Sequence, residues 1–173
     1  IAFSPDGGTV AHVGRGGVGL WEVASGRQIT GLEGHILNGD VAFSPDGATL
    51  ASGGSNENEV QLWDIASRQR VAALPGHTDS VSSVAFSPDG ATLASGSRDS
   101  TVKLWDVALR REIATLQHPG TVQSVAFSPD GATLASGASN PAGGGVIHVW
   151  DVSSSQEIAA LQGHTSGVAS VAF

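Results

Sequence analysis

The chain has 173 residues, of which 16 are acidic and 8 are basic, for a formal net charge of −8. Nucleic acids and anionic membranes are bound chiefly through clustered Lys and Arg side chains, so this balance disfavours both as partners. Cysteine is absent, which excludes disulfides and thiolate metal sites and fits a cytoplasmic protein. No apolar run is long enough to span a membrane.

One phrase, AFSPDG, recurs four times along the chain, beginning at Ala2, Ala42, Ala85 and Ala126. A Trp followed by an acidic residue comes after each copy, and these pairs are Trp21–Glu22, Trp63–Asp64, Trp105–Asp106 and Trp150–Asp151. A period of about 40–45 residues with GH and WD dipeptides is the signature of a propeller blade. The chain therefore resembles the WD-repeat β-propeller family over essentially its whole length.

The resemblance implies an all-β fold, a WD-repeat β-propeller with four blades of four antiparallel strands each. The predicted blades are about 1–34, 35–75, 76–117 and 118–162, and residues 163–173 begin a fifth. Family members most often have about seven blades, within the usual range for propellers. We therefore expect an open arc or a fragment of a larger ring.

A Gly-rich segment in the first blade matches G-x-G-x-x-G through Gly14, Gly16 and Gly19. This fingerprint binds a dinucleotide only where a strand precedes it and a helix follows. Here the following run, VGLWEV, has the pattern of a strand and ends in the Trp of the repeat. The segment is therefore predicted to be a turn, and no cofactor is expected.

The third blade holds a His, a Ser and an Asp that could be mistaken for a catalytic triad. The family resemblance assigns them instead to a hydrogen-bonded structural tetrad of His77, Ser95 (or Ser97), Asp99 and Trp105. A buried imidazole needs partners on both nitrogens and a buried carboxylate needs donors, which the tetrad supplies. A nucleophilic Ser would need exposure and an oxyanion hole, for which the sequence gives no sign. We predict no catalytic residues.

The same turn differs in two other blades. In the second blade it reads SNENE, where Asn56, Glu57 or Asn58 could replace the Asp, a choice that the sequence leaves open. In the fourth blade it is expanded by four residues to NPAGGG, which predicts a protruding loop that either binds a partner or has drifted freely.

The six His residues do not predict a metal site. Four of them are separated by the blade period, at His35, His77, His118 and His164. The others, His12 and His148, are isolated strand positions, and no pair has the spacing of zinc ligands.

The resemblance implies a non-catalytic scaffold that binds proteins or peptides on the top face of the propeller, where strand four connects to strand one and strand two to strand three. The matching positions are Ser80, Ser82, Arg98, Thr121 and Gln123. Their alternative interpretation is as ordinary solvated loop residues, because none is an aromatic anchor.

Two further classes of function remain open. The segment could be a regulatory domain fused to a catalytic domain such as a Ser/Thr kinase, since similar repeats are common in bacterial signalling proteins and the composition is Ala- and Gly-rich with more Arg than Lys. An enzyme with catalytic groups on the loops is the other alternative. Open apolar flanks further predict that the isolated chain is marginally stable or self-associates.

Overall fold

The computed structural model describes residues 1–14, 16–33, 39–54, 58–140 and 143–173. All regular structure in these ranges is β-strand, arranged as four 4-stranded antiparallel sheets. No helix in the described ranges is long and apolar enough to cross a membrane. The predicted all-β class and the four sheets of four strands are confirmed.

Each sheet is one blade, and its strands follow one another in chain order. Blade one contains β1 (Ala2–Phe3), β2 (Thr9–Gly14), β3 (Gly17–Glu22) and β4 (Gln28–Glu33). Blade two contains β5 (Val41–Phe43), β6 (Thr49–Gly53), β7 (Val60–Asp64) and β8 (Gln69–Leu74). Blade three contains β9 (Val81–Phe86), β10 (Thr92–Ser97), β11 (Thr101–Asp106) and β12 (Arg111–Gln117). Blade four contains β13 (Thr121–Phe127), β14 (Thr133–Ser139), β15 (Gly145–Asp151) and β16 (Gln156–His164).

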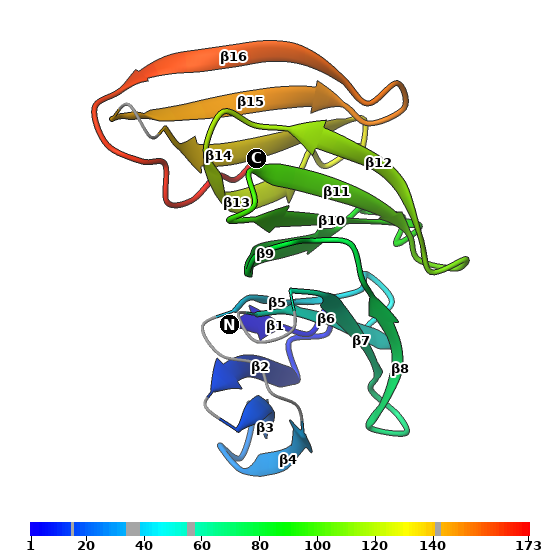
Figure 1. The fold of residues 1–173 in the computed structure, drawn as a ribbon. Coiled ribbons are helices and arrows are strands. Elements are labelled where there is room, and N and C mark those ends of the chain that lie inside the picture. The colour runs from blue at the N-terminus through cyan, green and yellow to red at the C-terminus, as the bar shows by residue number, and fades with distance from the viewer. Residues whose placement is uncertain (15, 34–38, 55–57, 141–142) are drawn as a thin grey trace.

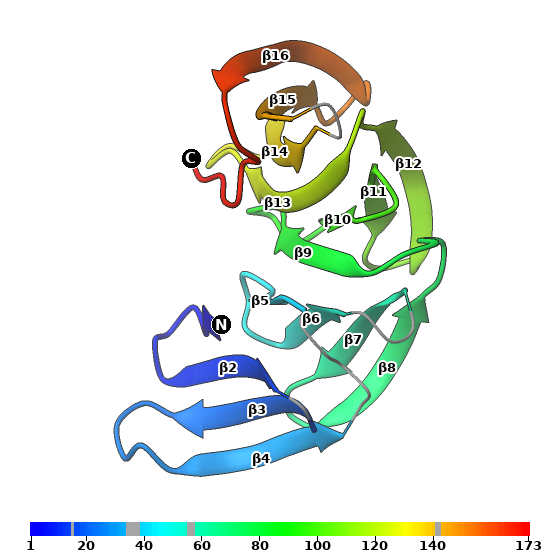
Figure 2. The same ribbon diagram turned by 60° about the vertical axis from the view of Figure 1, so that its left-hand side comes forward.

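The four blades follow one another in an open arc, with blades one and four at its two ends (Figures 1 and 2). The first strand of each blade lies on the inner side of the arc and the fourth strand on the outer side, as Figure 2 shows. Blades two and three therefore each present one face to the blade before and the other to the blade after.

The hydrophobic core lies between the blades. Three clusters of buried side chains join blade one to two, two to three and three to four, and they include Leu50, Leu93 and Leu134 respectively. Each fully buried aliphatic side chain contributes on the order of 1.5–3 kcal/mol. Because both faces of a sheet are covered, the strands carry apolar residues on both sides, as the sequence of β11 predicts.

Close packing against the following segment explains the Gly near the end of the second strand in blades two, three and four. A Cβ added at Gly96 would lie 2.6 Å from Cγ1 of Val122, in the next blade. The same contact recurs at Gly137, where a Cβ would lie 2.7 Å from Cγ1 of Val168. Residues 165–173 therefore pack against blade four in the way that β13 packs against blade three.

Hydrogen bonds also join the innermost strands. The Val84 N–H donates to Oδ2 of Asp40 in the preceding blade, at 3.2 Å. The Val125 N–H donates to Oγ of Ser83 at 3.3 Å, and the Val171 N–H donates to Oγ of Ser124 at 3.2 Å. A polar side chain three residues before the Phe of AFSPDG thus links blade two to blade three, blade three to blade four, and blade four to residues 165–173.

The AFSPDG turns have the geometry that their sequence predicts. In the second blade Gly47 has φ of 72°, and Oδ1 of Asp46 accepts hydrogen bonds from the Ser44 hydroxyl and the Ala48 N–H. The other three copies repeat these bonds.

The Gly-rich segment of blade one is a hairpin. Gly14 pairs with Gly17 at its tip, and β3 follows directly, so the helix that a dinucleotide site requires is absent from these described residues. A Cβ at Gly19 would lie 2.5 Å from Nε2 of His12. The packing of His12 thus explains one of the three glycines of the fingerprint.

Candidate functional site: the His–Ser–Trp network and its copies

The structure brings together the four side chains of the predicted tetrad in blade three. Trp105 Nε1 donates to Oγ of Ser95 at 2.8 Å, and the Ser95 hydroxyl lies 2.8 Å from Nε2 of His77. Nδ1 of His77 lies 2.8 Å from Oδ2 of Asp99. The chain of contacts assigns the hydrogen to Nδ1 of His77, because Nε2 accepts from the hydroxyl.

The alternative Ser97 has a different role. Its hydroxyl donates to the Asp79 carbonyl at 3.0 Å and accepts from the Asp99 N–H at 3.1 Å. Ser95 and Ser97 share a strand face, so the sequence could not separate them. The register of β10 places Ser95 next to Lys103 and leaves Ser97 beside the loops at the strand end.

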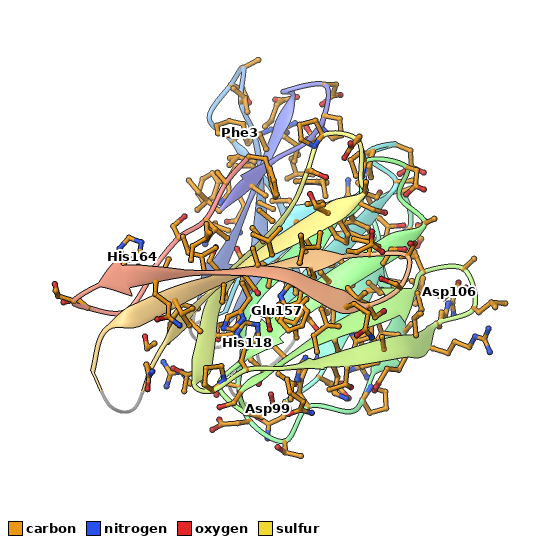
Figure 3. All side chains as sticks on the ribbon, turned by 90° about the horizontal axis from the view of Figure 1, so that it is seen from above. Phe3, Asp99, Asp106, His118, Glu157 and His164 are labelled. Atoms are coloured by element: carbon orange, nitrogen blue, oxygen red, sulfur yellow. The ribbon has the colours of Figure 1, made fainter. Side chains whose placement is uncertain are left out.

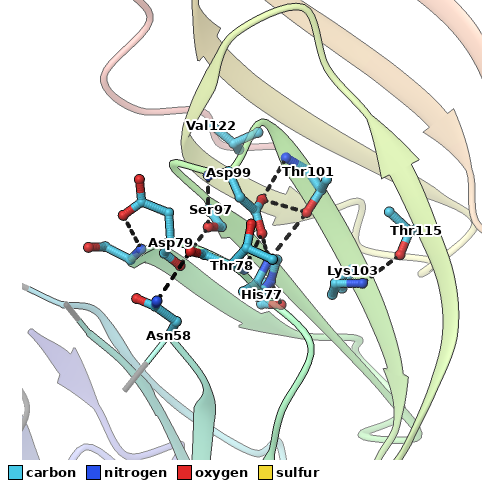
Figure 4. A network of polar contacts seen from close by, with 12 residues as sticks. Asn58, His77, Thr78, Asp79, Ser97, Asp99, Thr101, Lys103, Thr115 and Val122 are labelled. Carbon is cyan, nitrogen blue, oxygen red and sulfur yellow. Dashed lines mark hydrogen bonds and ion pairs between the residues drawn. The ribbon is translucent and has the colours of Figure 1, made fainter. Parts of the chain in front are cut away.

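Further donors hold the Asp99 carboxylate in place (Figure 4). The Thr101 hydroxyl and N–H donate to Oδ1 at 2.6 and 2.9 Å, and the Thr78 N–H donates to Oδ2 at 3.0 Å. Burial by itself raises the pKa of Asp99, but these bonds together with His77 outweigh it, so the pKa lies below the ordinary value. Asp99 is therefore a carboxylate at neutral pH.

Burial has the larger effect on the imidazole. It lowers the pKa of His77, and the opposing attraction of Asp99 does not fully restore it. The contact between His77 and Asp99 is therefore a hydrogen bond from a neutral imidazole to a carboxylate at pH 7, although the two groups stand at ion-pair distance.

The burial of Ser95 bears on what this group can do chemically. The residue is 0% exposed, and its hydroxyl is already engaged by Trp105 and His77. A substrate could reach the oxygen only if the blade opened. The arrangement resembles a triad in composition but lacks the exposed nucleophile that acyl transfer needs.

The other blades hold partial copies. In blade two Trp63 Nε1 donates to Oγ of Ser52 at 2.9 Å, while His35, Asn56 and Glu57 lie outside the described residues. The remaining candidate in that turn, Asn58, donates through Nδ2 to the Thr78 carbonyl at 3.2 Å and so links blade two to blade three.

Blade four keeps three members of the network. Trp150 Nε1 donates to Oγ of Ser136 at 2.7 Å, and that hydroxyl lies 2.9 Å from Nε2 of His118. Asn140 stands at the sequence position of Asp99, but Nδ1 of His118 makes no hydrogen bond within the described part of the chain. Burial, with a smaller repulsion from His148, lowers the pKa of His118 to about 3.

Three segments of the chain, residues 26–64, 68–106 and 110–151, match the model of the WD domain, G-beta repeat family. The chain is a WD40 repeat protein. Each matched WD40 repeat contains the outermost strand of one blade and the three inner strands of the next. Because consecutive WD40 repeats interlock in this way, each blade is held by covalent links to its neighbours as well as by packing.

No curated protein matches the chain. Among solved structures, the WD40 chain is similar to hydrazine synthase of Kuenenia stuttgartiensis, with a TM-score of 0.88 and 20% sequence identity. The similarity covers 95% of this chain and 48% of that one, so this chain spans about half the length of that protein. At this level of identity the likeness shows the propeller fold alone.

The predicted partner-binding residues of the WD40 blades have unequal surroundings. Arg98 is exposed, whereas Ser80, Ser82, Thr121 and Gln123 are half-buried. The Ser82 hydroxyl donates to the Val122 carbonyl of the next blade at 2.8 Å, and Gln123 Nε2 donates to the Thr121 hydroxyl at 3.2 Å. Ser82 thus contributes to the contact between blades, a role that its small polar side chain did not indicate.

Two polar pairs on the third and fourth strands were missed by the sequence analysis. Lys103 Nζ donates to Oε2 of Glu112 at 2.8 Å in blade three, and Nδ1 of His148 lies 3.3 Å from Oε1 of Glu157 in blade four. Lys103 and His148 both stand two residues before the Trp of their blade. Comparing that position between WD40 repeats would have found them. Within the described ranges no group of three or more His, Asp or Glu side chains is arranged to hold a metal ion.

Proposed function

We propose that the chain is a non-catalytic scaffold that binds a protein or peptide on the top face of its blades. WD40 domains generally mediate protein interactions, which supports binding as the general mode of action. The observation that carries the proposal is the burial of Ser95 within a closed network, because the most enzyme-like group of the chain is used to hold blade three together.

The top face is favoured as the binding surface because exposed polar side chains gather there. Thr78, Asp79 and Arg98 are exposed at the connections of blade three. They are supported from below by the buried Asp99 network, so the loops present these side chains from a fixed base.

The proposal is tested by charge reversal at the two ends of blade three. Partners captured on the immobilised chain should be lost with Arg98→Glu and retained with Arg111→Glu, since Arg111 is exposed at the opposite end of the blade. Mass spectrometry of the captured proteins gives the comparison. Equal capture by both variants would contradict binding at the top face.

The absence of catalysis is tested separately. Generic ester, peptide and phosphate substrates should show no turnover by the purified chain. Turnover that Ser95→Ala abolishes, with the circular dichroism spectrum unchanged, would show that the propeller is an enzyme.

A regulatory segment within a larger cytoplasmic bacterial signalling protein is a finer form of the same proposal. The Ala- and Gly-rich composition supports it, and the sequence of the full gene tests it directly. For the 173-residue chain alone we propose self-association, because Phe3 and Phe173 at the two ends of the arc are 61% and 59% exposed. Light scattering that showed a monomer at high concentration would contradict self-association.

A further inference from the structure

Blade four contains a cavity of about 270 Å³ at its top end. Its wall includes Pro119, Asn140, His148, Ala160, Gln162 and His164. Gln162 and His164 form an exposed rim, whereas His148 is only 8% exposed. Neither ring nitrogen of His148 makes a hydrogen bond within the described part of the chain. Leaving a buried polar group unpaired is unfavourable, so this ring marks a place where a ligand atom would be stabilised.

In blade three the space that corresponds to this cavity is filled by the side chain of Lys103. Lys103 stands at the position of His148, and its ammonium donates to the Thr115 hydroxyl at 2.8 Å (Figure 4). The same ammonium donates to Oε2 of Glu112, also at 2.8 Å. Lys103 pairs with Thr115 across the strands, just as His148 pairs with Ala160. Blade four has thus replaced the Lys and the Thr by smaller groups.

The acidic partner of the lysine is kept in blade four. Glu157 stands at the position of Glu112, opposite the blade Trp, and its Oε1 lies 3.3 Å from Nδ1 of His148. His118 and Glu157 are labelled on blade four in Figure 3. A carboxylate beside Nδ1 favours the tautomer with hydrogen on that nitrogen, which leaves Nε2 of His148 as an acceptor. The site therefore offers an acceptor and a nearby negative charge.

An anionic ligand is disfavoured by two other replacements. In blade three the donors to the Asp99 carboxylate come from Thr78 and Thr101. The residues at these positions in blade four are Pro119, which has no N–H, and Val146, which has no hydroxyl. Blade four keeps only the imidazole of His118 among the groups that hold the carboxylate in blade three, and it also keeps Glu157, which attracts a cation.

We propose that this cavity receives the ammonium group of a lysine side chain from a bound peptide. The inference rests on the proposed scaffold function and gives it a site and a ligand chemistry. The incoming ammonium takes the place that the Lys103 ammonium holds in blade three. It donates to Nε2 of His148 and is attracted by Glu157, and the lysine stem lies along Ala160 and Pro119.

The test uses the peptide acetyl-Gly-Gly-Lys-Gly-Gly-amide and its counterparts with norleucine, acetyl-lysine and arginine. Imidazole ¹⁵N resonances of His118 and His148 are followed by NMR during titration of the chain at pH 7.5. Only the lysine peptide should shift them strongly. Loss of one charge-assisted hydrogen bond is worth about 1.5–3 kcal/mol. The double variant His148→Lys/Ala160→Thr, which rebuilds the pair of blade three, should therefore weaken lysine binding by about tenfold or more.

Two further variants keep the test decisive. Ala160→Leu fills the cavity without changing charge and should also abolish the response, which covers the case in which the double variant fails to fold. Thr115→Ala, at the equivalent position of blade three, should leave the response intact. Equal shifts with lysine and norleucine, a stronger response to arginine, or no shift with any peptide would overturn the proposal.

The experiments distinguish an error in the proposed lysine site from an error in the proposed scaffold function. A protein partner that is lost with Arg98→Glu but retained with His148→Lys/Ala160→Thr leaves the scaffold function standing and overturns the lysine site. A lysine response that depends on His148, with no partner at the top face, supports the cavity and contradicts the scaffold function.

Discussion

Blades three and four have similar sequences, yet the equivalent buried imidazole has hydrogen-bond partners on both nitrogens in blade three and on only one in blade four. In blade three His77 is bonded on both nitrogens, to Ser95 and to a carboxylate that has its own donors. In blade four His118 keeps the bond to Ser136 and makes no hydrogen bond through Nδ1 within the described residues. The difference shows that the Asp, rather than the His or the Trp, closes the network.

The largest expected effect comes from removing that Asp. Asp99→Ala strands the N–H groups of His77, Thr78 and Thr101, so it should lower the free energy of unfolding by about 1–3 kcal/mol. Urea denaturation of the chain measures the change. Asn140→Ala at the matching position of blade four is the control and should change stability little. Similar losses for the two variants would contradict the assignment of Asp99 to the network.

A smaller effect is expected at the junction of the two blades. Ser82→Ala removes the hydroxyl that donates to the Val122 carbonyl and should cost about 0.5–1.5 kcal/mol. Gln123→Ala, whose amide bonds within its own blade, should cost less. Denaturant midpoints that rank the two variants in the reverse order would show that Ser82 does not join the blades.

The smallest effect is expected at the ion pair of blade three. Burial raises the pKa of Glu112, but the hydrogen bonds from Lys103 and Thr115 and the charge of Lys103 together outweigh it, so the pKa lies below its ordinary value. The Glu112 side chain is 37% exposed, so solvent screens the pair. Lys103→Met should therefore change stability by less than about 1 kcal/mol. A loss as large as that of Asp99→Ala would mean that this pair, rather than the Asp99 network, distinguishes blade three.

The sequence was sufficient to predict the repeat and the strand order, because these depend on fixed spacings along the chain. The resemblance to WD repeats supplied His77, Asp99 and Trp105 as members of the tetrad. The sequence could not choose between Ser95 and Ser97, which share a strand face and differ only in the end of the strand that they approach. It also gave no sign that His148 would lie against His118, with ring centroids 4.6 Å apart. That contact joins the third strand of blade four to the turn before its first strand.

The partner-binding residues were harder to predict for a physical reason. Small polar side chains such as Ser82 serve equally well on a solvated loop and in a contact between blades, and only the packing of β9 against β13 decides between the two. Arg98, by contrast, is exposed as its length and charge indicate.

The most direct test is the pH dependence of indole N–H exchange at Trp105 and Trp150, the donors to Ser95 and Ser136. The pKa of His118 is lowered to about 3 in the folded blade, so the folded blade holds this imidazole neutral. In the unfolded chain the same imidazole takes up a proton below its pKa of about 6.5. The stabilisation from the neutral imidazole is therefore complete above about pH 6.5 and is lost as the pH falls below that value. Between pH 7.5 and 5.5 the opening free energy at Trp150 should fall by about 1.4 kcal/mol, roughly tenfold in protection.

Trp105 should lose less protection over the same range. The carboxylate of Asp99, whose pKa is lowered, stays charged at pH 5.5 and partly offsets the effect of burial on His77. NMR measures both indoles in one sample, after correction for intrinsic exchange. Greater acid sensitivity at Trp150 is the result expected if the Asp closes the network. Equal loss at the two indoles, or greater loss at Trp105, would contradict it.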